Sequence, residues 1–422
     1  MTEFQIATVE DLINRGVLEK PLDGNHGGLH PKNSDYVDEG IPFIMASDID
    51  RDRINFENCK YITREQASTL RKGFAKEGDV LLSHKATIGK TAVVENIPTD
   101  FIVLTPQVTY YRILDESILD RYYLHYYFKS PYFQSILNSW SGSGSTRAYI
   151  SITEQRKLPI LLPSIDVQKR ITSILRSLDL KIELNLKMNK TLEEMAMTLY
   201  KHWFVDFGPF QDEEFVESEL GMIPKGWKVI QVKDLGEVIT GKTPSTKVKE
   251  YYGDKIPFIK IPDMHGNVYI VKTETMLSEL GAQSQKNKML PPNTVCVSCI
   301  ATPGLVVLTS EMSQTNQQIN SVVCKEGVSP YFVYLFFKSI SDNIVTLGSG
   351  GTATLNLNKG DFSRIKLLMP TNEVMTGFNN KVESIFNLIK INSLNNIELE
   401  NLRDYLLPRL LSGEIDVSKA EK

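Results

Sequence analysis

The chain has 422 residues, of which 41% are hydrophobic and 23% charged, and its formal net charge is −4. This length exceeds what one hydrophobic core supports. The sequence has no apolar stretch of about 20 residues, which argues against a membrane span, and no apolar segment near its N-terminus, which argues against a secretion signal. The four cysteines show no disulfide framework, so we expect a cytoplasmic protein of two to four domains without a membrane partner.

The net charge does not decide whether the chain binds nucleic acid, because binding needs only a basic face. Residues 1–160 contain 18 Lys and Arg against 21 Asp and Glu, whereas residues 227–370 contain 15 against 11. Neither balance excludes DNA, and neither argues for it.

Residues 1–160 are predicted to form a first domain of short strands and turns. Apolar runs at 80–82 and 102–104 are bounded by turn residues, which is typical of strands. One amphipathic helix is expected at 117–139. Its many Tyr and Phe residues could stack on bases, but aromatic residues at helical spacing more often belong to a core, and we favour the core. A Gly-rich loop follows at 142–146.

A long helix is predicted for residues 161–208. Its apolar positions alternate four and three residues apart over more than four heptads, which is the pattern of a coiled-coil seam. These positions are Ile171, Leu175, Leu178, Ile182, Leu192, Ala196, Leu199 and Trp203, with Asn185 and Asn189 between Ile182 and Leu192. The seam is about 50 Å long at ~1.5 Å per residue.

Residues 209–226 are acidic, and we interpret them as a solvated linker. Residues 227–370 then repeat the first domain, with a helix expected at about 329–342 and a second Gly-rich loop at 348–352. At an offset of 215 residues, the repeat maps Ile41-Pro42-Phe43-Ile44 onto Ile256-Pro257-Phe258-Ile259, and Ser83, Ala86, Thr87 and Gly89 onto Ser298, Ala301, Thr302 and Gly304. A fold used twice can hold two similar ligands at once.

A second long helix is predicted within residues 371–422, with its seam offset by 207 residues and with Asn392 and Asn396 at the polar positions. The first helix leads to the second domain and the second helix starts there, so pairing must make them antiparallel. Paired residue numbers should then add to about 581. This places Asn185 opposite Asn396 and Asn189 opposite Asn392, a layer that fixes register, and Arg403 opposite Leu178 as the one mismatch.

The order of domain, helix, domain and helix resembles the DNA-specificity (S) subunit of type I restriction-modification enzymes. So do Ile-Pro-Phe-Ile followed by an acidic residue (Asp48, Asp263), Ala-Thr-Ile-Gly-Lys at 86–90, Asn-Gln-Gln-Ile-Asn at 316–320, and Leu-Gly-Met-Ile-Pro-Lys-Gly-Trp at 220–227. The resemblance covers nearly the whole chain. One departure is Pro303 together with the missing lysine at position 305, which we expect to alter that loop.

This resemblance implies an α+β fold with two similar target-recognition domains and an antiparallel coiled coil of two long helices, related by a pseudo-two-fold axis. It implies that each domain reads half of a bipartite site on double-stranded DNA. It also implies that the helices dock two methyltransferase (M) subunits, which endonuclease/translocase (R) subunits join. The chain itself would be no enzyme and need no cofactor, whereas the partner subunits would use S-adenosylmethionine, ATP and magnesium.

The candidate DNA contacts lie in loops, where amides can bind base edges and Lys, Arg and Thr can bind phosphates. The competing interpretations are flexible turns, connecting loops and amides that cap strand ends. In the first domain the candidates are Asn25, His26, Lys85, Thr87, Lys90 and Arg147. In the second domain they are Lys242, Thr243, Lys260, Thr302, Asn316, Gln317 and Thr352.

No metal site is predicted. Cys296 and Cys299 would lie on opposite faces of a strand, and the six histidines show no ligand spacing. A tandem catalytic domain remains an alternative, although no nucleophile, base and orienting group repeat between the copies. An assembly scaffold that does not bind DNA is a second alternative.

Overall fold

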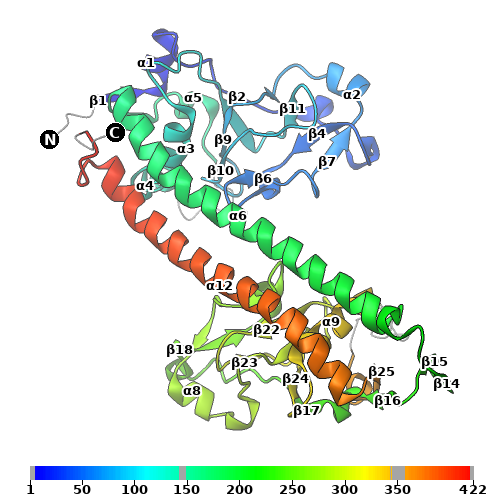
Figure 1. The fold of residues 1–422 in the computed structure, drawn as a ribbon. Helices are drawn as coiled ribbons and strands as arrows, with labels where there is room; N and C mark the ends of the chain where they lie inside the picture. The colour runs from blue at the N-terminus through cyan, green and yellow to red at the C-terminus, as the bar shows by residue number, and fades with distance from the viewer. Residues whose placement is uncertain (1–4, 142–148, 343, 345–356, 419–422) are drawn as a thin grey trace. The chain divides into compact units, whose positions relative to one another are not determined.

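The computed structural model describes residues 5–141, 149–342, 344 and 357–418 (Figure 1). The chain divides into two compact units, unit 1 (residues 1–180 and 400–422) and unit 2 (residues 181–399). Each unit combines mixed sheets with helices, which confirms the α+β fold class. None of the helices in the described part of the chain is long and apolar enough to cross a membrane.

Unit 1 is built on a four-stranded and a five-stranded sheet. The four-stranded sheet has the order β10-β9-β12-β2 and is antiparallel. Its strands are β2 (Leu22–Asp23), β9 (Val80–Ser83), β10 (Thr91–Val93) and β12 (Val108–Tyr111). The second sheet, in the order β3-β7-β4-β11-β8, consists of β3 (Tyr36–Val37), β4 (Ile41–Ile44), β7 (Lys60–Ile62), β8 (Phe74–Ala75) and β11 (Ile102–Leu104). Two short pairs join β1 (Gln5–Thr8) to β13 (Pro159–Leu162) and β5 (Ile49–Asp50) to β6 (Arg53–Ile54).

The helices of this domain are α1 (Val9–Asn14), α2 (Arg64–Ser68), α3 (Arg121–Lys129), α4 (Pro131–Trp140) and α5 (Ile152–Gln155). The expectation of one helix at 117–139 was wrong. Pro131 has no backbone N–H, and Ser130 accepts a 3.2 Å hydrogen bond from the Phe133 N–H, so a new helix starts there. The aromatic side chains of α3 are in the core, as expected: Tyr123, Tyr127 and Phe128 are fully buried.

Unit 2 repeats this plan. Its five-stranded sheet has the order β17-β24-β21-β22-β19 and consists of β17 (Gly236–Thr240), β19 (Tyr269–Ile270), β21 (Val295–Ser298), β22 (Val306–Thr309) and β24 (Ile319–Cys324). A second sheet contains β18 (Tyr252–Ile259), β20 (Met276–Leu277) and β23 (Gln314–Thr315), and a separate pair joins β16 (Lys228–Gln231) to β25 (Lys366–Met369). The helices are α7 (Ile261–Met264), α8 (Glu279–Gln283), α9 (Pro330–Ser339) and α11 (Lys359–Arg364).

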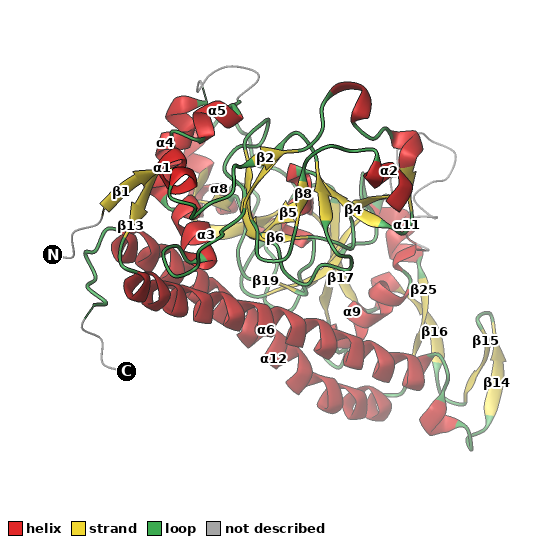
Figure 2. Cartoon of the chain, turned by 90° about the horizontal axis from the view of Figure 1, so that it is seen from above, coloured by secondary structure: helices red, strands yellow, loops and turns green. Residues whose placement is uncertain are grey.

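The acidic segment 209–226 is more ordered than a plain solvated linker. It contains the antiparallel hairpin of β14 (Phe215–Ser218) and β15 (Gly221–Pro224), visible at the edge of unit 2 in Figure 2. Ion pairs join Lys225 to Glu214 and Lys366 to Glu219, and the Phe207 and Phe215 rings pack edge to face. These contacts give the segment a folded structure of its own.

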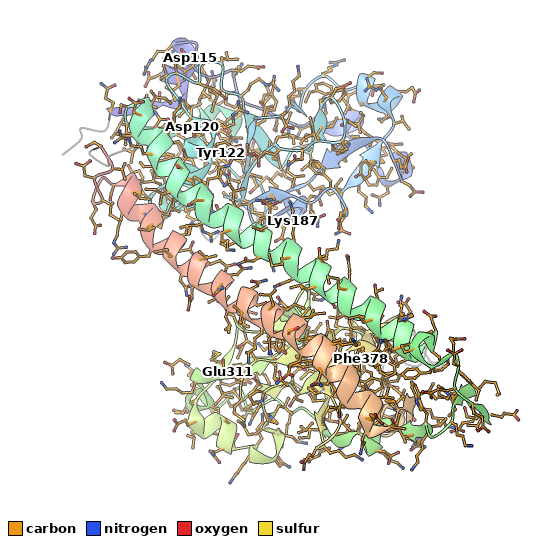
Figure 3. The ribbon with its side chains drawn as sticks, in the orientation of Figure 1. Asp115, Asp120, Tyr122, Lys187, Glu311 and Phe378 are labelled. Carbon is orange, nitrogen blue, oxygen red and sulfur yellow. The ribbon has the colours of Figure 1, made fainter. Side chains whose placement is uncertain are left out.

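Helices α6 (Ile165–Phe204) and α12 (Asn372–Leu411) form the predicted antiparallel coiled coil. In unit 1, Ile171 and Leu175 of α6 share a core with Leu410 of α12. In unit 2, Trp203 of α6 lies 5.7 Å from Phe378 of α12, ring centre to ring centre. Figure 3 labels Phe378 on α12. With 40 residues each, the helices are about 60 Å long rather than 50 Å, because each begins six residues before its first seam position.

Candidate nucleic-acid interface

In each unit, several loops lie together where the strands of one sheet end. This is the four-stranded sheet of unit 1 and the five-stranded sheet of unit 2, and we call it the main sheet. In unit 1, β9 ends beside the start of β12, with Ser83 opposite Val108, and β2 ends beside Thr109. Unit 2 has the same arrangement around β21, β24 and β17. We name the loops by equivalent pairs: loop A (24–28 and 241–246), loop B (69–73 and 284–288), loop C (105–107 and 316–318) and loop D (84–90 and 299–305).

Main-chain hydrogen bonds tie these loops together in the same way in both units. In unit 1, the N–H of His84 in loop D donates to the carbonyl of Gln107 in loop C at 2.9 Å. The equivalent bond in unit 2 runs from Cys299 to Gln318 at 2.8 Å. Loop A is bonded next to this contact in each unit: the Gly24 N–H donates to the carbonyl of Thr105 in loop C, and the Lys242 N–H donates to the carbonyl of Thr315, the residue of β23 that precedes loop C. Residues 105–107 and 316–318 therefore occupy comparable places in the two units.

Loop D has the same backbone features at two positions in both copies. Ala86 and Ala301 are left-handed, with φ of 64° and 66°, and Gly89 and Gly304 each return a hydrogen bond to the preceding strand, to the carbonyls of Ser83 and Ser298. Between these positions the backbones differ, because residues 303–304 form a turn that residues 88–89 lack, so the change that accompanies Pro303 is local. The side chains differ as well, since Lys85 and Lys90 are replaced by Ile300 and Leu305.

Loop B is the part of the edge that sequence reasoning missed. The buried Asn25 donates from Nδ2 to the Lys72 carbonyl at 2.6 Å and accepts from the Arg71 N–H at Oδ1 at 3.0 Å. In unit 2 the buried Gln285 makes the corresponding link from loop B to loop A, donating to the Lys242 carbonyl at 2.6 Å. The usable signal was the offset of 215, which maps Arg71 onto Lys286, a cation in both copies.

The candidates of unit 1 differ in exposure. Lys85 and Thr87 are exposed on loop D, and His26 is half-exposed on loop A, 2.8 Å from the carboxylate of Asp23. Lys90 is partly buried and donates to the carbonyl of Ile49 at 2.7 Å. Asn25 braces loops A and B, so a base contact by its amide would require those two hydrogen bonds to break.

The candidates of unit 2 also meet at the edge. Thr243 of loop A donates to Oε1 of Gln317 in loop C at 2.7 Å, and Lys242, Gln317 and Thr302 are exposed. Asn316 is buried and its amide is bonded to Gln318, which is the strand-capping role considered as its alternative. Lys260 follows β18, and its Nζ donates to Thr275 at 2.6 Å. Arg147 and Thr352, with the Gly-rich loops around them, lie outside the described residues.

A buried carboxylate connects loops A, B and D of unit 1. Asp23 pairs with Lys72 and His26, and Nε2 of His84 lies 4.0 Å from it. Burial lowers the pKa of His84, and its Nδ1 bonds the Ile150 carbonyl at 2.9 Å, so the ring is neutral near pH 7. The equivalent position in unit 2 is Cys299, so this polar cluster belongs to one copy alone.

The repeated acidic residue after Ile-Pro-Phe-Ile has a structural role. Asp48 accepts a 2.8 Å hydrogen bond from the Met45 N–H, and Asp263 accepts the same bond from Lys260 at 2.8 Å. Burial raises the pKa of Asp48. The residue pair that marks the repeat therefore closes a turn and is not presented to a ligand.

The two neighbouring cysteines face different cores, as expected. Cys296 and Cys299 pack in separate hydrophobic clusters, both are free thiols, and burial raises their pKa values to about 12 and about 11. Among the described residues, no group of three or more His, Cys, Asp or Glu side chains could hold a metal ion.

The fold defines a class of protein in which one domain occurs twice in a chain. The loops at the sheet edge have equivalent positions in the two domains but different side chains. The family profile described as "Type I restriction modification DNA specificity domain" matches residues 13–194 and 224–401, so the chain belongs to the type I restriction-modification DNA-specificity family.

Similar proteins agree with this assignment. The type I restriction enzyme HindI specificity subunit of Haemophilus influenzae is 35% identical, over 89% of this chain and 94% of its own length. The MjaIX specificity subunit of Methanocaldococcus jannaschii is 28% identical, over 93% and 91%. The crystal structure of a type I S subunit from M. genitalium has a TM-score of 0.56 at 13% identity, covering 97% of this chain and 96% of that one, which shows a shared fold.

Proposed function

We propose that this chain is the DNA-recognising subunit of a type I restriction-modification complex, and that each unit reads one half of a bipartite site on double-stranded DNA. The duplicated sheet edge carries this proposal. Its backbone is repeated, but the side chains at equivalent positions differ: Asn25 and His26 of unit 1 correspond to Lys242 and Thr243 of unit 2. The same backbone with different side chains in the two units suits two half-sites of different sequence.

Within each edge, the exposed side chains divide by chemistry. Lys85, Lys242 and Lys286 carry charges for phosphate oxygens, which position the duplex without reading sequence. His26 and Gln317 present groups that can donate to and accept from base edges. Sequence discrimination would come from the second set and most of the affinity from the first.

Helices α6 and α12 are proposed to dock two methyltransferase subunits, which endonuclease/translocase subunits then join. In unit 2, both helices expose apolar side chains away from the seam: Leu184, Met188 and Met195 on α6, and Leu388, Ile391 and Leu394 on α12. Apolar side chains aligned on a helix and left in water favour burial against a partner. Catalysis, with S-adenosylmethionine, ATP and magnesium, would belong to those partners in the cytoplasm.

Binding by the isolated chain should be weak. The net charge is −4, and residues 1–160 hold more acidic than basic side chains, so few counterions are released when DNA binds. Partner subunits would add basic surface. Tight binding of the purified chain to its own site at physiological salt would contradict this part of the proposal.

The decisive experiment maps methylated adenines in DNA from cells that express the chain with its methyltransferase partner. We expect one bipartite motif. A chimera whose residues 13–160 come from the Haemophilus influenzae relative should change one half of that motif and leave the other half intact. A change in both halves, or in neither, would reject the assignment of one half-site to each unit.

The same map separates the alternatives. A scaffold that does not bind DNA predicts that the motif is insensitive to both recognition units. A tandem enzyme predicts chemistry by the chain without partners. The acidic residue and the Ser, Ala and Gly positions that repeat serve turns and packing, and no repeated pair of nucleophile and base lies at the two described edges, which favours the DNA-reading function.

A further inference from the structure

Unit 1 has a basic concavity that extends from loop B along β2 and β12. The concavity has a volume of about 570 Å³, and it is lined by the cations Arg64, Arg71, Lys72, Lys76 and Arg112, with Phe101 among the apolar residues of its wall. Five of its twelve lining residues are basic and none is acidic. This is a marked concentration of positive charge in a domain where acidic side chains outnumber basic ones.

The cations of this concavity divide into fixed and available groups. Arg112 is held by Asp79 at 2.8 Å and by Glu19 at 2.9 Å, and Lys72 is held by Asp23. Arg64 pairs with Asp100 at 2.9 Å, but both side chains are largely exposed, so that pair contributes little and Arg64 can turn to a ligand. Arg71 and Lys76 are exposed and form no ion pair within the described residues.

The backbone under the available cations is rigid. Asn25 holds the Arg71 N–H and the Lys72 carbonyl, as described above. Gly73 has a φ of +84°, and a Cβ there would lie 2.7 Å from the Cα of Gly24, so loops A and B are in direct contact. A site whose main chain is fixed before binding loses little conformational entropy when a ligand arrives.

Unit 2 has lost most of these charges. The repeat places Glu279, Pro291 and Val323 where unit 1 has Arg64, Lys76 and Arg112, and of the three available cations only Arg71 has a basic counterpart, Lys286. The N-caps Thr63 and Ser278 of the two short helices, which accept equivalent hydrogen bonds, confirm this alignment. The concavity is therefore a property of the first recognition unit.

We propose that this concavity binds phosphate groups of the DNA backbone next to the half-site read by unit 1, and that the equivalent surface of unit 2 contributes less to this particular contact. This rests on the proposed function. Phosphate fits because Arg71 and Lys76 offer a guanidinium and an ammonium group that pair with no carboxylate among the described residues. DNA is favoured over a free polyphosphate because loop B, which carries Arg71 and Lys72, is bonded to the proposed base-reading loop A.

The test uses the chain in complex with its methyltransferase partner and a fluorescent duplex that carries its motif, titrated at several salt concentrations. The variant R71A/K76A should lower the slope of log affinity against log salt by about 2, weaken cognate and unrelated duplexes to a similar extent, and leave the methylated motif unchanged. The matched control R15A/K157A removes two exposed cations of unit 1 elsewhere and should keep the wild-type slope.

The outcomes separate the two proposals. If the wild-type complex does not bind DNA, the proposed function fails. If it binds and the R71A/K76A variant, shown to be folded by its thermal unfolding, keeps the wild-type slope, this inference alone is overturned. Titration with inorganic triphosphate addresses the other source of phosphate: saturable binding that cognate DNA does not displace would also overturn the assignment to the DNA backbone.

Discussion

Asn185 of α6 donates a 2.8 Å hydrogen bond from Nδ2 to Oδ1 of Asn396 of α12, inside an otherwise apolar seam. Asn392 makes the same contact to Asn189 at 2.9 Å. Adding the repeat offset of 207 to Asn185 and Asn189 gives Asn392 and Asn396, so the repeat maps one asparagine pair onto the other. The same contact is therefore present twice. Such a layer costs stability but fixes register, because a slip of either helix would bury unpaired amides.

This pairing predicts non-additive mutations. The variant N185L leaves the Asn396 amide buried without its partner and should reduce the free energy of unfolding by about 1–3 kcal/mol. The double variant N185L/N396L should recover that loss, because two leucines extend the apolar seam. Urea unfolding of both single variants and the double variant gives the coupling energy. Additive single effects would show that the two amides do not interact.

The mismatch predicted at Arg403 has a structural partner. Arg403 donates to Asp179 of α6 at 2.8 Å, and the Tyr126 hydroxyl of α3 donates to the same carboxylate at 2.6 Å. Burial alone would raise the pKa of Asp179, but Lys129, Tyr126 and Arg403 hold it below its ordinary value. Tyr126 of α3, Asp179 of α6 and Arg403 of α12 therefore connect the recognition domain of unit 1 to both long helices.

We therefore expect R403L to destabilise unit 1, although it restores the heptad pattern. The loss should be about 2 kcal/mol, because the partly buried Asp179 keeps a charge that Lys129 and Tyr126 alone compensate poorly. R403L/D179N should recover part of it by removing that charge. Thermal unfolding of the three proteins tests this, with L402A on an exposed α12 position as the control. An R403L variant as stable as wild type would mean that the heptad pattern outweighs the ion pair.

The coiled coil could be predicted in detail because it depends on local periodicity and chain connectivity. The residue sum of 581 places Asn185, Asn189 and Trp203 opposite the partners that they have in the structure. The break between α3 and α4 also has a local signal, the N-cap Ser130 followed by Pro131. The continuous run of aromatic residues favours a single helix and outweighs that signal in a prediction from sequence.

The recognition edge could be predicted only in part. The candidate loops were found because they follow strands that repeat. Loop B was missed because its place depends on nonlocal bonds, from Asn25 to residues 46 and 47 positions away. For the same reason Asn25 was interpreted as a base reader, since nothing local shows that its amide is already used.

A pH effect follows from His125 on α3. Burial lowers its pKa to about 4, whereas the unfolded chain titrates near 6.5. The unfolded state therefore binds a proton first as pH falls, so this residue destabilises the fold progressively between pH 6.5 and 4, by up to about 3 kcal/mol. H125Q should flatten the fall in the free energy of unfolding over that range. H265Q, at an exposed position, should not, and equal slopes in both variants would refute the assignment.

The close contact of loops A and C gives the last prediction. A Cβ on Gly24 would lie 1.9 Å from the Leu104 carbonyl oxygen, and one on Gly241 would lie 2.1 Å from that of Asn316. Each alanine must push loop A off the edge of its own unit, while the coiled coil and the other unit keep their contacts. If each unit reads one half-site, as proposed, G24A should make the half of the methylated motif assigned to unit 1 less specific, and G241A should do the same to the other half. G28A, whose Cβ would meet nothing within 4 Å, should leave the motif unchanged. If G24A and G241A degraded the same half, or both halves equally, the two edges would not be independent readers.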